Sequence, residues 1–177
     1  MKVIAIGGEP GSGKSTLMKV IMEALGVGSK VHEDFKLVPY HKNNNTYVLG
    51  KYEDGEVFSG TDRMSMAVQP EAIKFLDTLP EDSVVLFEGD RLFTASFLEN
   101  CAEKYDTKII YLQTDKATRK ERYAERGSNQ NETWLAGRES KIANIMTNFD
   151  LMFLFEKLPH NTLEEQKKAV DFIVKLV

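Results

Sequence analysis

Residues 8–15 read G-E-P-G-S-G-K-S and fill every fixed position of the phosphate-binding motif G-x-x-x-x-G-K-S. An apolar run, Lys2–Ile6, precedes the motif, and apolar residues recur at helical spacing behind it. The chain is therefore constrained to fold here as a strand, a glycine-rich turn and a helix. In that arrangement the backbone N–H groups of the turn point at phosphate oxygens, and the N-terminus of the helix favours an anion.

The motif assigns a role to its polar residues. Lys14 supplies a mobile cation for the outer phosphates of a nucleotide, and the hydroxyl of Ser15 is placed to bind Mg²⁺. We therefore expect ATP and Mg²⁺ as cofactors and Lys14 as a catalytic residue. The residues expected to bind the nucleotide are Gly8, Gly11, Ser12, Gly13, Lys14, Ser15 and Thr16. The alternative, an ordinary glycine-rich turn, requires every fixed position to be filled by chance.

Length and composition limit the other classes of protein. A chain of 177 residues has the size of one domain, so we expect residues 1–177 to fold as a single unit. Cys101 is the one cysteine, which excludes an internal disulfide and fits a reducing, cytoplasmic location. No run approaches about 18 apolar residues, so no membrane span is expected. The net charge of −4 does not indicate a protein coated for nucleic-acid binding, although it allows a local basic cleft.

Short, continuously apolar runs predict strands that are buried on both faces, as in a parallel central sheet. These runs are Lys2–Ile6, Val84–Phe87 and Lys108–Leu112, and a fourth strand is expected near Met152–Glu156. Helical segments separate the runs, so the predicted class is α/β with a doubly wound parallel sheet. The last helix starts with a capping box, Thr162–Glu165, and its apolar stripe comprises Leu163, Val170, Ile173, Val174 and Val177.

Residues 31–60 depart from this pattern and predict a small antiparallel meander inserted between the first two strand–helix units. Its strands and turns are expected at Phe35–Tyr40, Asn43–Asn45, Thr46–Tyr52, Asp54-Gly55 and Glu56–Phe58. Pro39 would confine its strand to an edge or a bulge. The insertion is expected to shape an acceptor pocket whose edge carries Tyr40, Tyr47 and Tyr52; the alternative is a surface ornament.

Glu88 is the candidate metal ligand of the second buried strand. It follows four apolar residues, Val84–Phe87, so its carboxylate would emerge at the carboxyl end of the strand, beside the phosphate-binding loop. A carboxylate at that point, together with Ser15, would hold Mg²⁺ directly or through water. The alternative is that Glu88 caps the helix that follows.

Two short charged segments are the candidates for binding the acceptor of the phosphoryl group. Asp90 and Arg91 follow Glu88 and are expected to face the acceptor. Arg63 lies on an irregular connection with Asp62 and is expected to bind the acceptor as well. Either Asp62 or Asp34 is expected to take the proton of an acceptor hydroxyl. A phosphate acceptor would need no such base.

Residues 115–148 are predicted to form an arginine-rich lid. The segment Asp115–Gly127 is too polar for a core helix, and one helical face carries Arg119, Arg122 and Arg126. In the next helix Arg138 and Lys141 are expected to point outward, and the inward positions are Leu135, Ile142, Ile145, Met146 and Phe149. Such a lid would close on ATP and bring Arg122 and Arg126 to the transferring phosphoryl group as catalytic residues. The alternative is a solvated helix held by its own charge pairs.

With these motifs in place, the chain resembles small P-loop kinases with the nucleoside-monophosphate-kinase-like fold over nearly its whole length. The resemblance rests on Gly8–Ser15, on Glu88, on the Arg119–Gly127 segment and on a closing strand, loop and helix around Leu158–Thr162. In that family the last loop passes near the adenine. The resemblance therefore implies that His160 and Asn161 lie close to the base of the bound nucleotide.

A narrower resemblance is to phage 5-hydroxymethyluracil DNA kinases. The segments that look like theirs are Leu49–Tyr52, Gly60–Arg63, Glu88–Arg91 and Arg126–Gln130. The resemblance implies an ATP- and Mg²⁺-dependent phosphotransferase of DNA modification, with 5-hydroxymethyluracil in DNA as the leading acceptor. Nucleosides, nucleoside monophosphates and other small molecules are the alternative acceptors. A GTPase switch and a motor ATPase are disfavoured, because the chain has neither an N-K-x-D motif nor a D-E pair at the end of its acidic strand.

Overall fold

The computed structural model describes residues 1–53, 59–125 and 131–177. The strands within these ranges are β1 Lys2–Gly7, β2 Tyr40–Asn43, β3 Thr46–Leu49, β4 Val84–Glu88, β5 Asp106–Gln113 and β6 Phe155–Pro159. The α-helices are α1 Lys14–Ala24, α2 Val68–Thr78, α3 Ala95–Lys104, α4 Lys116–Glu125, α5 Glu132–Met146 and α6 Leu163–Val174. Two 3-10 helices are η1 Thr61–Arg63 and η2 Met152–Leu154. None of the helices in these ranges has the length and apolar character needed to cross a membrane.

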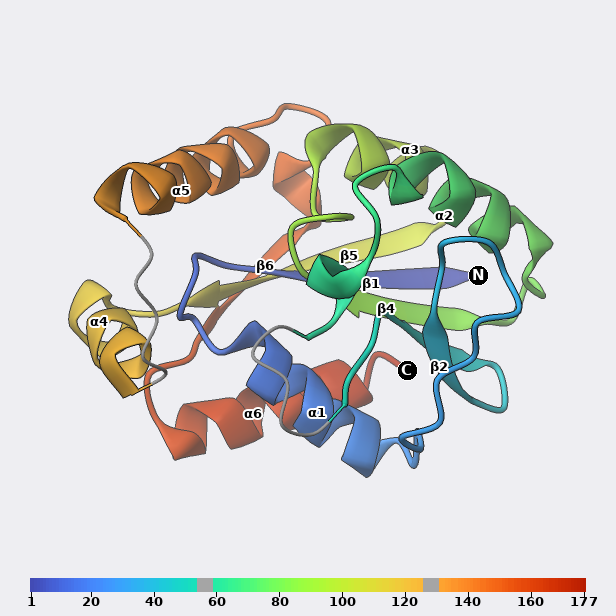
Figure 1. The fold of residues 1–177 in the computed structure, drawn as a ribbon, viewed down its shortest axis with the longest axis horizontal. Helices are drawn as coiled ribbons and strands as arrows, with labels where there is room; N and C mark the ends of the chain where they lie inside the picture. Colours follow the sequence, from blue (N-terminus) through green and yellow to red (C-terminus); the bar gives the residue numbers. More distant parts are fainter. Residues whose placement is uncertain (54–58, 126–130) are drawn as a thin grey trace.

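The strands form one sheet in the order β2-β3-β4-β1-β5-β6 (Figure 1). Every neighbouring pair is parallel except β2 and β3, which form an antiparallel hairpin at one edge. The register pairs Ile6 of β1 with Glu88 of β4 and Gly7 of β1 with Tyr111 of β5. Parallel pairing therefore brings the carboxyl ends of the central strands together at the start of the phosphate-binding loop.

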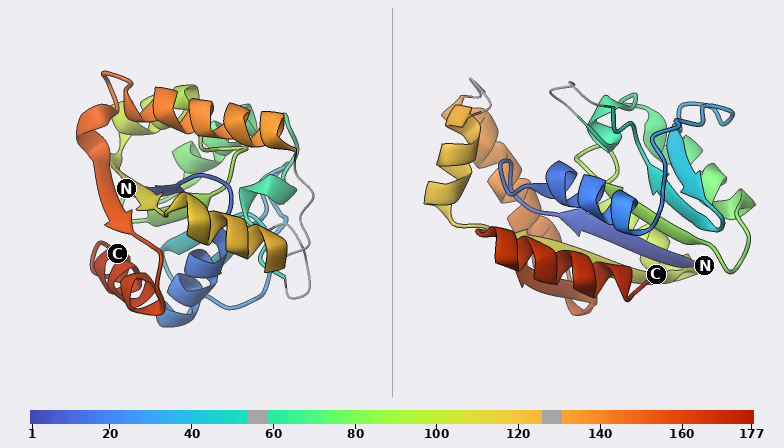
Figure 2. Two further views of the ribbon diagram at one scale, coloured as in Figure 1. Left: turned by 90° about the vertical axis from the view of Figure 1, so that its left-hand side faces the viewer. Right: turned by 90° about the horizontal axis from the view of Figure 1, so that it is seen from below.

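Helices cover both faces of this sheet, as Figures 1 and 2 show. The side chains of β1 are buried on both sides: Val3 and Ala5 join the core beneath α2, α3 and α5, whereas Ile4 and Ile6 join the core beneath α1 and α6. This two-sided burial explains the continuous apolar run in the sequence. The predicted α/β doubly wound fold is confirmed. In Figure 1, α4 lies beyond the carboxyl ends of β1 and β5, so the predicted lid faces the loop.

The predicted meander differs in two respects. No strand occupies residues 35–39; β2 begins only at Tyr40, because Pro39 has no N–H to donate to a ladder. The hairpin is an edge of the main sheet rather than a separate insert, since β3 pairs in parallel with β4. Pro39 lies directly before β2 and in no strand, so the strand that it was expected to confine is not formed, although β2 itself is an edge strand. The third predicted strand lies outside the described residues.

The remaining corrections concern strand bounds and exposed apolar residues. The fourth predicted strand begins three residues later than the start of its expected range, as β6 Phe155–Pro159, because η2 occupies Met152–Leu154. Phe149, expected to point inward, is 77% exposed and lies beyond the end of α5. Leu163, in the predicted stripe of the last helix, is 84% exposed because it is the first residue of α6. The capping box at Thr162 is confirmed.

Candidate functional site

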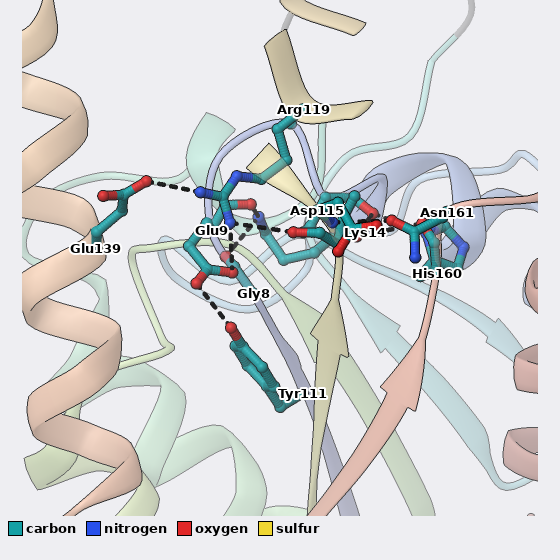
Figure 3. Close-up of polar contacts among 12 residues, drawn as sticks. Gly8, Glu9, Lys14, Tyr111, Asp115, Arg119, Glu139, His160 and Asn161 are labelled. Atoms are coloured by element: carbon teal, nitrogen blue, oxygen red, sulfur yellow. Dashed lines mark hydrogen bonds and ion pairs between the residues drawn. The ribbon is translucent and has the colours of Figure 1, made fainter. Parts of the chain in front are cut away.

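The phosphate-binding loop connects the carboxyl end of β1 to the N-terminus of α1. Gly11 and Gly13 have φ of +77° and +90°, conformations that favour glycine, and a methyl group on Gly13 would stand 2.8 Å from Cε1 of His160. The Nζ of Lys14 donates to the carbonyl oxygens of Gly8 at 3.0 Å and Glu9 at 3.2 Å (Figure 3). The side chain of Lys14 therefore folds back over its own loop, and its contact with the outer phosphates of a nucleotide stays a prediction.

The residues of this loop fit the phosphates of a nucleotide. The hydroxyl of Ser12 is buried and has no hydrogen-bond partner among the described residues, so a phosphate oxygen would supply the acceptor it lacks. Ser15 and Thr16 lie in the first turn of α1, where the helix N-terminus favours an anion. The geometry of the loop thus agrees with the role that the sequence predicts for it.

Glu88 lies at the carboxyl end of β4 and is 1% exposed. Its carboxylate accepts a hydrogen bond from Tyr52 Oη at 3.2 Å and another from the side chain of Ser15. Burial raises the pKa of Glu88 to about 7, although the nearby Lys14 acts in the opposite direction. Glu88 does not cap the following helix, because Thr94 caps α3 by accepting from the N–H of Phe97. The capping alternative is therefore wrong.

The next carboxylate of the site, Asp62, is joined to the turn after β4. Its Oδ1 accepts the backbone N–H of Asp90 at 2.7 Å, and its neighbour Thr61 donates from Oγ1 to the carbonyl oxygen of Glu88 at 2.8 Å. Burial and the negative charge of Asp90 raise the pKa of Asp62, whereas Lys14 lowers it. The carboxylate of Asp62 thus lies at the carboxyl end of β4, where it feels the charge of Lys14, and its role as a base stays a prediction.

Asp90 connects this turn to α5. Its carboxylate lies 3.0 Å from Nη1 of Arg138 and 3.7 Å from Nζ of Lys141. Lys141 Nζ also donates to the carbonyl oxygen of Asp90 at 3.1 Å, and burial lowers the pKa of this lysine. The prediction that Arg138 and Lys141 point outward is wrong, because both reach across to the end of β4. Periodicity alone did not reveal this, since the acidic partner lies about 50 residues earlier in the sequence.

Three other predicted site residues have no described contact with the phosphate-binding loop. Arg63 forms an ion pair with Glu53, and Arg91 donates from Nε to the carbonyl oxygen of Met64 at 3.3 Å. Asp34 is exposed and accepts a hydrogen bond from Tyr40 at 3.3 Å, near the β2 edge of the sheet. No contact described for Asp34 links it to the phosphate-binding loop, so Asp62 is the better-placed of the two candidate bases. The substrate roles of Arg63 and Arg91 stay predictions.

Glu9, at a variable position of the motif, ties the loop to both lid helices (Figure 3). Its Oε1 accepts from Tyr111 Oη at 2.7 Å, and its Oε2 lies 3.4 Å from Nη1 of Arg119. Arg119 also donates from Nη2 to Oε1 of Glu139 at 2.7 Å, so one guanidinium joins the loop, α4 and α5. A cavity of about 300 Å³ lies between Pro10 and these two helices. Glu9 was not predictable from the sequence, because the motif places no requirement on that position.

Arg122 contacts the backbone behind the loop. Its guanidinium donates to the carbonyl oxygens of Gly11, Ser12, His160 and Asn161 at 3.1 to 3.4 Å. Four carbonyl acceptors around one cation hold the loop against the segment that follows β6. The alternative of a helix held by its own charge pairs is wrong for Arg119 and Arg122. Contact of Arg122 with a transferring phosphoryl group stays a prediction, and Arg126 lies outside the described residues.

His160 and Asn161 also lie against the loop. The Nδ1 of His160 is 2.7 Å from the carbonyl oxygen of Ser12, and burial lowers the pKa of this imidazole. Asn161 accepts from the backbone N–H of Asp115 through Oδ1 at 2.8 Å (Figure 3). Both residues therefore brace the loop and the start of the lid, and their proximity to an adenine stays a prediction.

The prediction that three tyrosines form the aromatic edge of an acceptor pocket is wrong. Tyr40, Tyr47 and Tyr52 are 8%, 4% and 5% exposed. Tyr40 and Tyr47 pack with Phe75 of α2 at ring-centroid distances of 4.9 and 6.1 Å. They are buried because the β2–β3 hairpin extends the main sheet, so α2 covers one of its faces. A solvent-facing stacking surface is therefore not formed by these three rings.

The metal-binding groups of the site are few. Within the described ranges, no three His, Cys, Asp or Glu side chains come together as a metal cluster. Mg²⁺ usually binds through one or two carboxylates together with substrate phosphates and water, rather than in an all-protein cage. Glu88 and Ser15 next to a phosphate-binding loop fit that donor set.

Comparisons with known proteins agree with this geometry. The family model described as P-loop Nucleotide Kinase3 matches residues 1–152. An uncharacterized protein from Eubacterium ventriosum ATCC 27560 has a similar structure, with a TM-score of 0.51, 16% identity, and coverage of 98% of this chain and 96% of that chain. A gluconokinase from Sinorhizobium meliloti 1021 gives a TM-score of 0.51 and 12% identity, over 99% of this chain and 94% of that one. At these identities the similarity shows the fold. A comparison with curated protein sequences found no match.

Proposed function

We propose that this chain, which belongs to the P-loop Nucleotide Kinase3 family, transfers the γ-phosphoryl group of ATP to a hydroxyl group with the aid of Mg²⁺. The observation that carries the proposal is the placement of two carboxylates, Glu88 and Asp62, around Lys14. Glu88 is hydrogen-bonded to Ser15 and serves the metal, whereas Asp62 is joined to the turn at Asp90 and serves the acceptor. A nucleotide-binding protein without transfer has no use for the second carboxylate.

Each residue then has a chemical role. The loop N–H groups and Lys14 bind the β- and γ-phosphates and stabilise the charge that develops during transfer. Ser15 and Glu88 would hold Mg²⁺, which neutralises charge on the phosphates when bound. Asp62 accepts the proton of the acceptor hydroxyl while the oxygen of that hydroxyl bonds to the γ-phosphorus. The bond to the β–γ bridging oxygen breaks, and ADP leaves. A raised pKa suits Asp62 to this task, because it makes the carboxylate a stronger base.

The charge of Asp62 also bears on the class of acceptor. Asp90 is paired with Arg138 and Lys141, but an acceptor phosphate bound beside the Asp62 carboxylate would be repelled by it. A hydroxyl group instead donates a hydrogen bond to such a group. We therefore propose a hydroxyl acceptor in preference to a nucleoside monophosphate.

The leading candidate for this acceptor is 5-hydroxymethyluracil in DNA. The segments Gly60–Arg63 and Glu88–Arg91, which resemble those of phage kinases of that class, supply the contacts between η1 and β4 described above. Two basic side chains of α5, Arg138 and Lys141, pair with Asp90 at the same turn, and a phosphate of a nucleic acid would compete with that carboxylate for them.

A small hydroxyl compound is the second candidate. The burial of the three tyrosines removes the expected stacking surface, and the net charge of −4 disfavours a long contact with DNA. The gluconokinase of similar fold supports testing a sugar acid in this role.

The test is transfer of label from γ-labelled ATP to a panel of acceptors. The panel comprises DNA with and without 5-hydroxymethyluracil, in single and double strands, together with gluconate, nucleosides and nucleoside monophosphates. We expect label on the hydroxymethylated DNA, with more on single strands, because extrusion of a paired base costs a few kcal/mol. Transfer to DNA is also expected to fall steeply with salt.

The panel separates the alternatives. Label on gluconate or a nucleoside, with none on DNA, would establish the small-molecule candidate. Label on nucleoside monophosphates alone would contradict a hydroxyl acceptor. The Lys14→Ala variant is the control for transfer by this site, and it should label nothing.

A further inference from the structure

Tyr52 lies between the edge of the sheet and the proposed metal site. It follows β3 in a segment where Lys51 pairs with Gly60 in an isolated antiparallel bridge. The side chain of Tyr52 is 5% exposed, and its hydroxyl donates to Oε1 of Glu88 at 3.2 Å. Glu88 itself is 1% exposed. Water has little access to this carboxylate, so its orientation depends on its few protein partners.

Gly60 makes this contact sterically feasible. A methyl group on Gly60 would stand 2.2 Å from Oε1 of Glu88 and 2.7 Å from Oη of Tyr52, so any side chain there would separate the two groups. Gly60 also has a φ of +69°, which favours glycine for a second reason. The backbone, the phenol and the carboxylate are thus in close mutual contact at one point.

His41 of β2 fixes the backbone of Tyr52. The N–H of Tyr52 donates to Nε2 of His41 at 3.2 Å, and Nδ1 of His41 lies 3.1 Å from the carbonyl oxygen of Gly28. Because Nε2 is the acceptor, the proton resides on Nδ1 and is donated to Gly28. His41 is fully buried and both ring nitrogens are hydrogen-bonded, so it anchors the Tyr52 segment to β2 and to the connection after α1.

We propose that Tyr52 is a positioning residue for Glu88, which fixes one carboxylate oxygen so that the group is correctly oriented for the metal of a bound Mg²⁺–nucleotide complex. The proposal rests on the proposed function, in which Glu88 and Ser15 hold that metal. The ring of Tyr52 belongs to the core, whereas its hydroxyl acts on Glu88. Mg²⁺ requires near-ideal octahedral geometry, so a carboxylate free to rotate would bind it less well. Loss of such an outer partner typically lowers metal affinity by about 10- to 100-fold.

The test compares Tyr52→Phe with Tyr47→Phe. Both substitutions remove one hydroxyl from a tyrosine that is at most 5% exposed in or next to the β2–β3 hairpin, but only Tyr52 contacts Glu88. Binding of Mn²⁺, as a probe for Mg²⁺, is measured by electron paramagnetic resonance in the presence of the imido analogue of ATP. We expect Mn²⁺ affinity to fall about 10-fold in Tyr52→Phe and to be unchanged in Tyr47→Phe. Affinity for the metal-free analogue should be the same in both.

A kinetic measurement provides a second readout. At saturating ATP, Tyr52→Phe should raise the Mg²⁺ concentration required for half-maximal rate, and excess Mg²⁺ should restore much of kcat. A loss of activity that excess Mg²⁺ does not restore would contradict a role through the metal. Equal Mn²⁺ affinity in the wild type and Tyr52→Phe, or equal loss in the two tyrosine variants, would overturn the proposal. A Tyr52→Phe protein that fails to fold would also count against it, because the hydroxyl would then serve the fold.

Glu88→Gln separates this proposal from the function on which it rests. If Glu88→Gln weakens Mn²⁺ binding while Tyr52→Phe does not, the positioning role is wrong and the metal role of Glu88 stands. If Glu88→Gln leaves Mn²⁺ binding unchanged, the metal role itself is wrong.

Discussion

Replacing Glu88 by glutamine is expected to make the metal-free protein more stable above pH 7, although the substitution removes the proposed metal ligand. Burial raises the pKa of the Glu88 carboxyl from 4.5 to about 7, with Lys14 acting in the opposite direction. A raised pKa means that the folded protein binds this proton more tightly than the unfolded chain does. The stabilising contribution of Glu88 is therefore complete below pH 4.5 and is lost as the pH rises through about 7.

The size of this loss follows from the two pKa values. One pKa unit corresponds to about 1.36 kcal/mol, so a rise from 4.5 to about 7 gives roughly 3 kcal/mol over the whole titration. Between pH 5 and pH 8 the same relation gives about 2–3 kcal/mol, because the unfolded chain is already partly ionised at pH 5. Glutamine has a similar size, offers Tyr52 an oxygen acceptor and does not ionise. The variant therefore does not lose stability through ionisation at this position as the pH rises.

The assay is urea unfolding of both proteins at pH 5 and pH 8 in the presence of a chelator, with linear extrapolation to water. The stability of Glu88→Gln relative to the wild type should increase by about 2–3 kcal/mol between the two pH values. Glu81→Gln, at an exposed position, is the control and should show no such change. If the stability difference between Glu88→Gln and the wild type is the same at both pH values, the argument from burial of an ionised Glu88 is refuted.

Three further substitutions test the loop and its supports. Lys14→Ala is expected to lower kcat at least about 100-fold with an unchanged circular dichroism spectrum, because the charge on the transferring group loses its cation; near wild-type activity would exclude Lys14 from catalysis. Arg122→Ala is expected to weaken nucleotide binding and lower Tm together, since four carbonyl oxygens lose one guanidinium; a fall in kcat alone would instead indicate contact with the phosphoryl group. Gly13→Ala is expected to cost about 1–3 kcal/mol in urea unfolding, because the residue has φ +90° and faces His160; an unchanged midpoint would contradict that close approach.

Local signals in the sequence predicted the frame of the site. The motif of the phosphate-binding loop sets glycines, a lysine and a serine at fixed spacing, and the structure has this loop between β1 and α1. The central strands were predictable because burial on both faces requires continuous apolar runs. The position of Glu88 followed from one such run, since a parallel strand ends at the same edge of the sheet as its neighbours.

The contacts within the site were less predictable. Lys141 has the spacing of an outward residue, but its partner Asp90 lies on a turn about 50 residues earlier. Glu9 occupies a variable position, and its contact with Arg119 forms only when α4 packs against the loop. Neither pairing leaves a periodic signal in the sequence, because both depend on where separate elements meet.

The sequence by itself determined the phosphate-binding loop, the parallel strands and the capped last helix, because each depends on residues that are close together in the chain. Only the tertiary structure decided that the β2–β3 hairpin joins the main sheet, which buries its tyrosines and directs Tyr52 to Glu88. Pairing of β3 with β4 joins segments about 40 residues apart. Whether the hairpin pairs with the sheet or stays separate depends on side-chain packing, which no local sequence pattern records. The residues of the phosphate-binding loop are thus evident from a short stretch of sequence, whereas the orientation of the neighbouring carboxylates depends on the folded sheet.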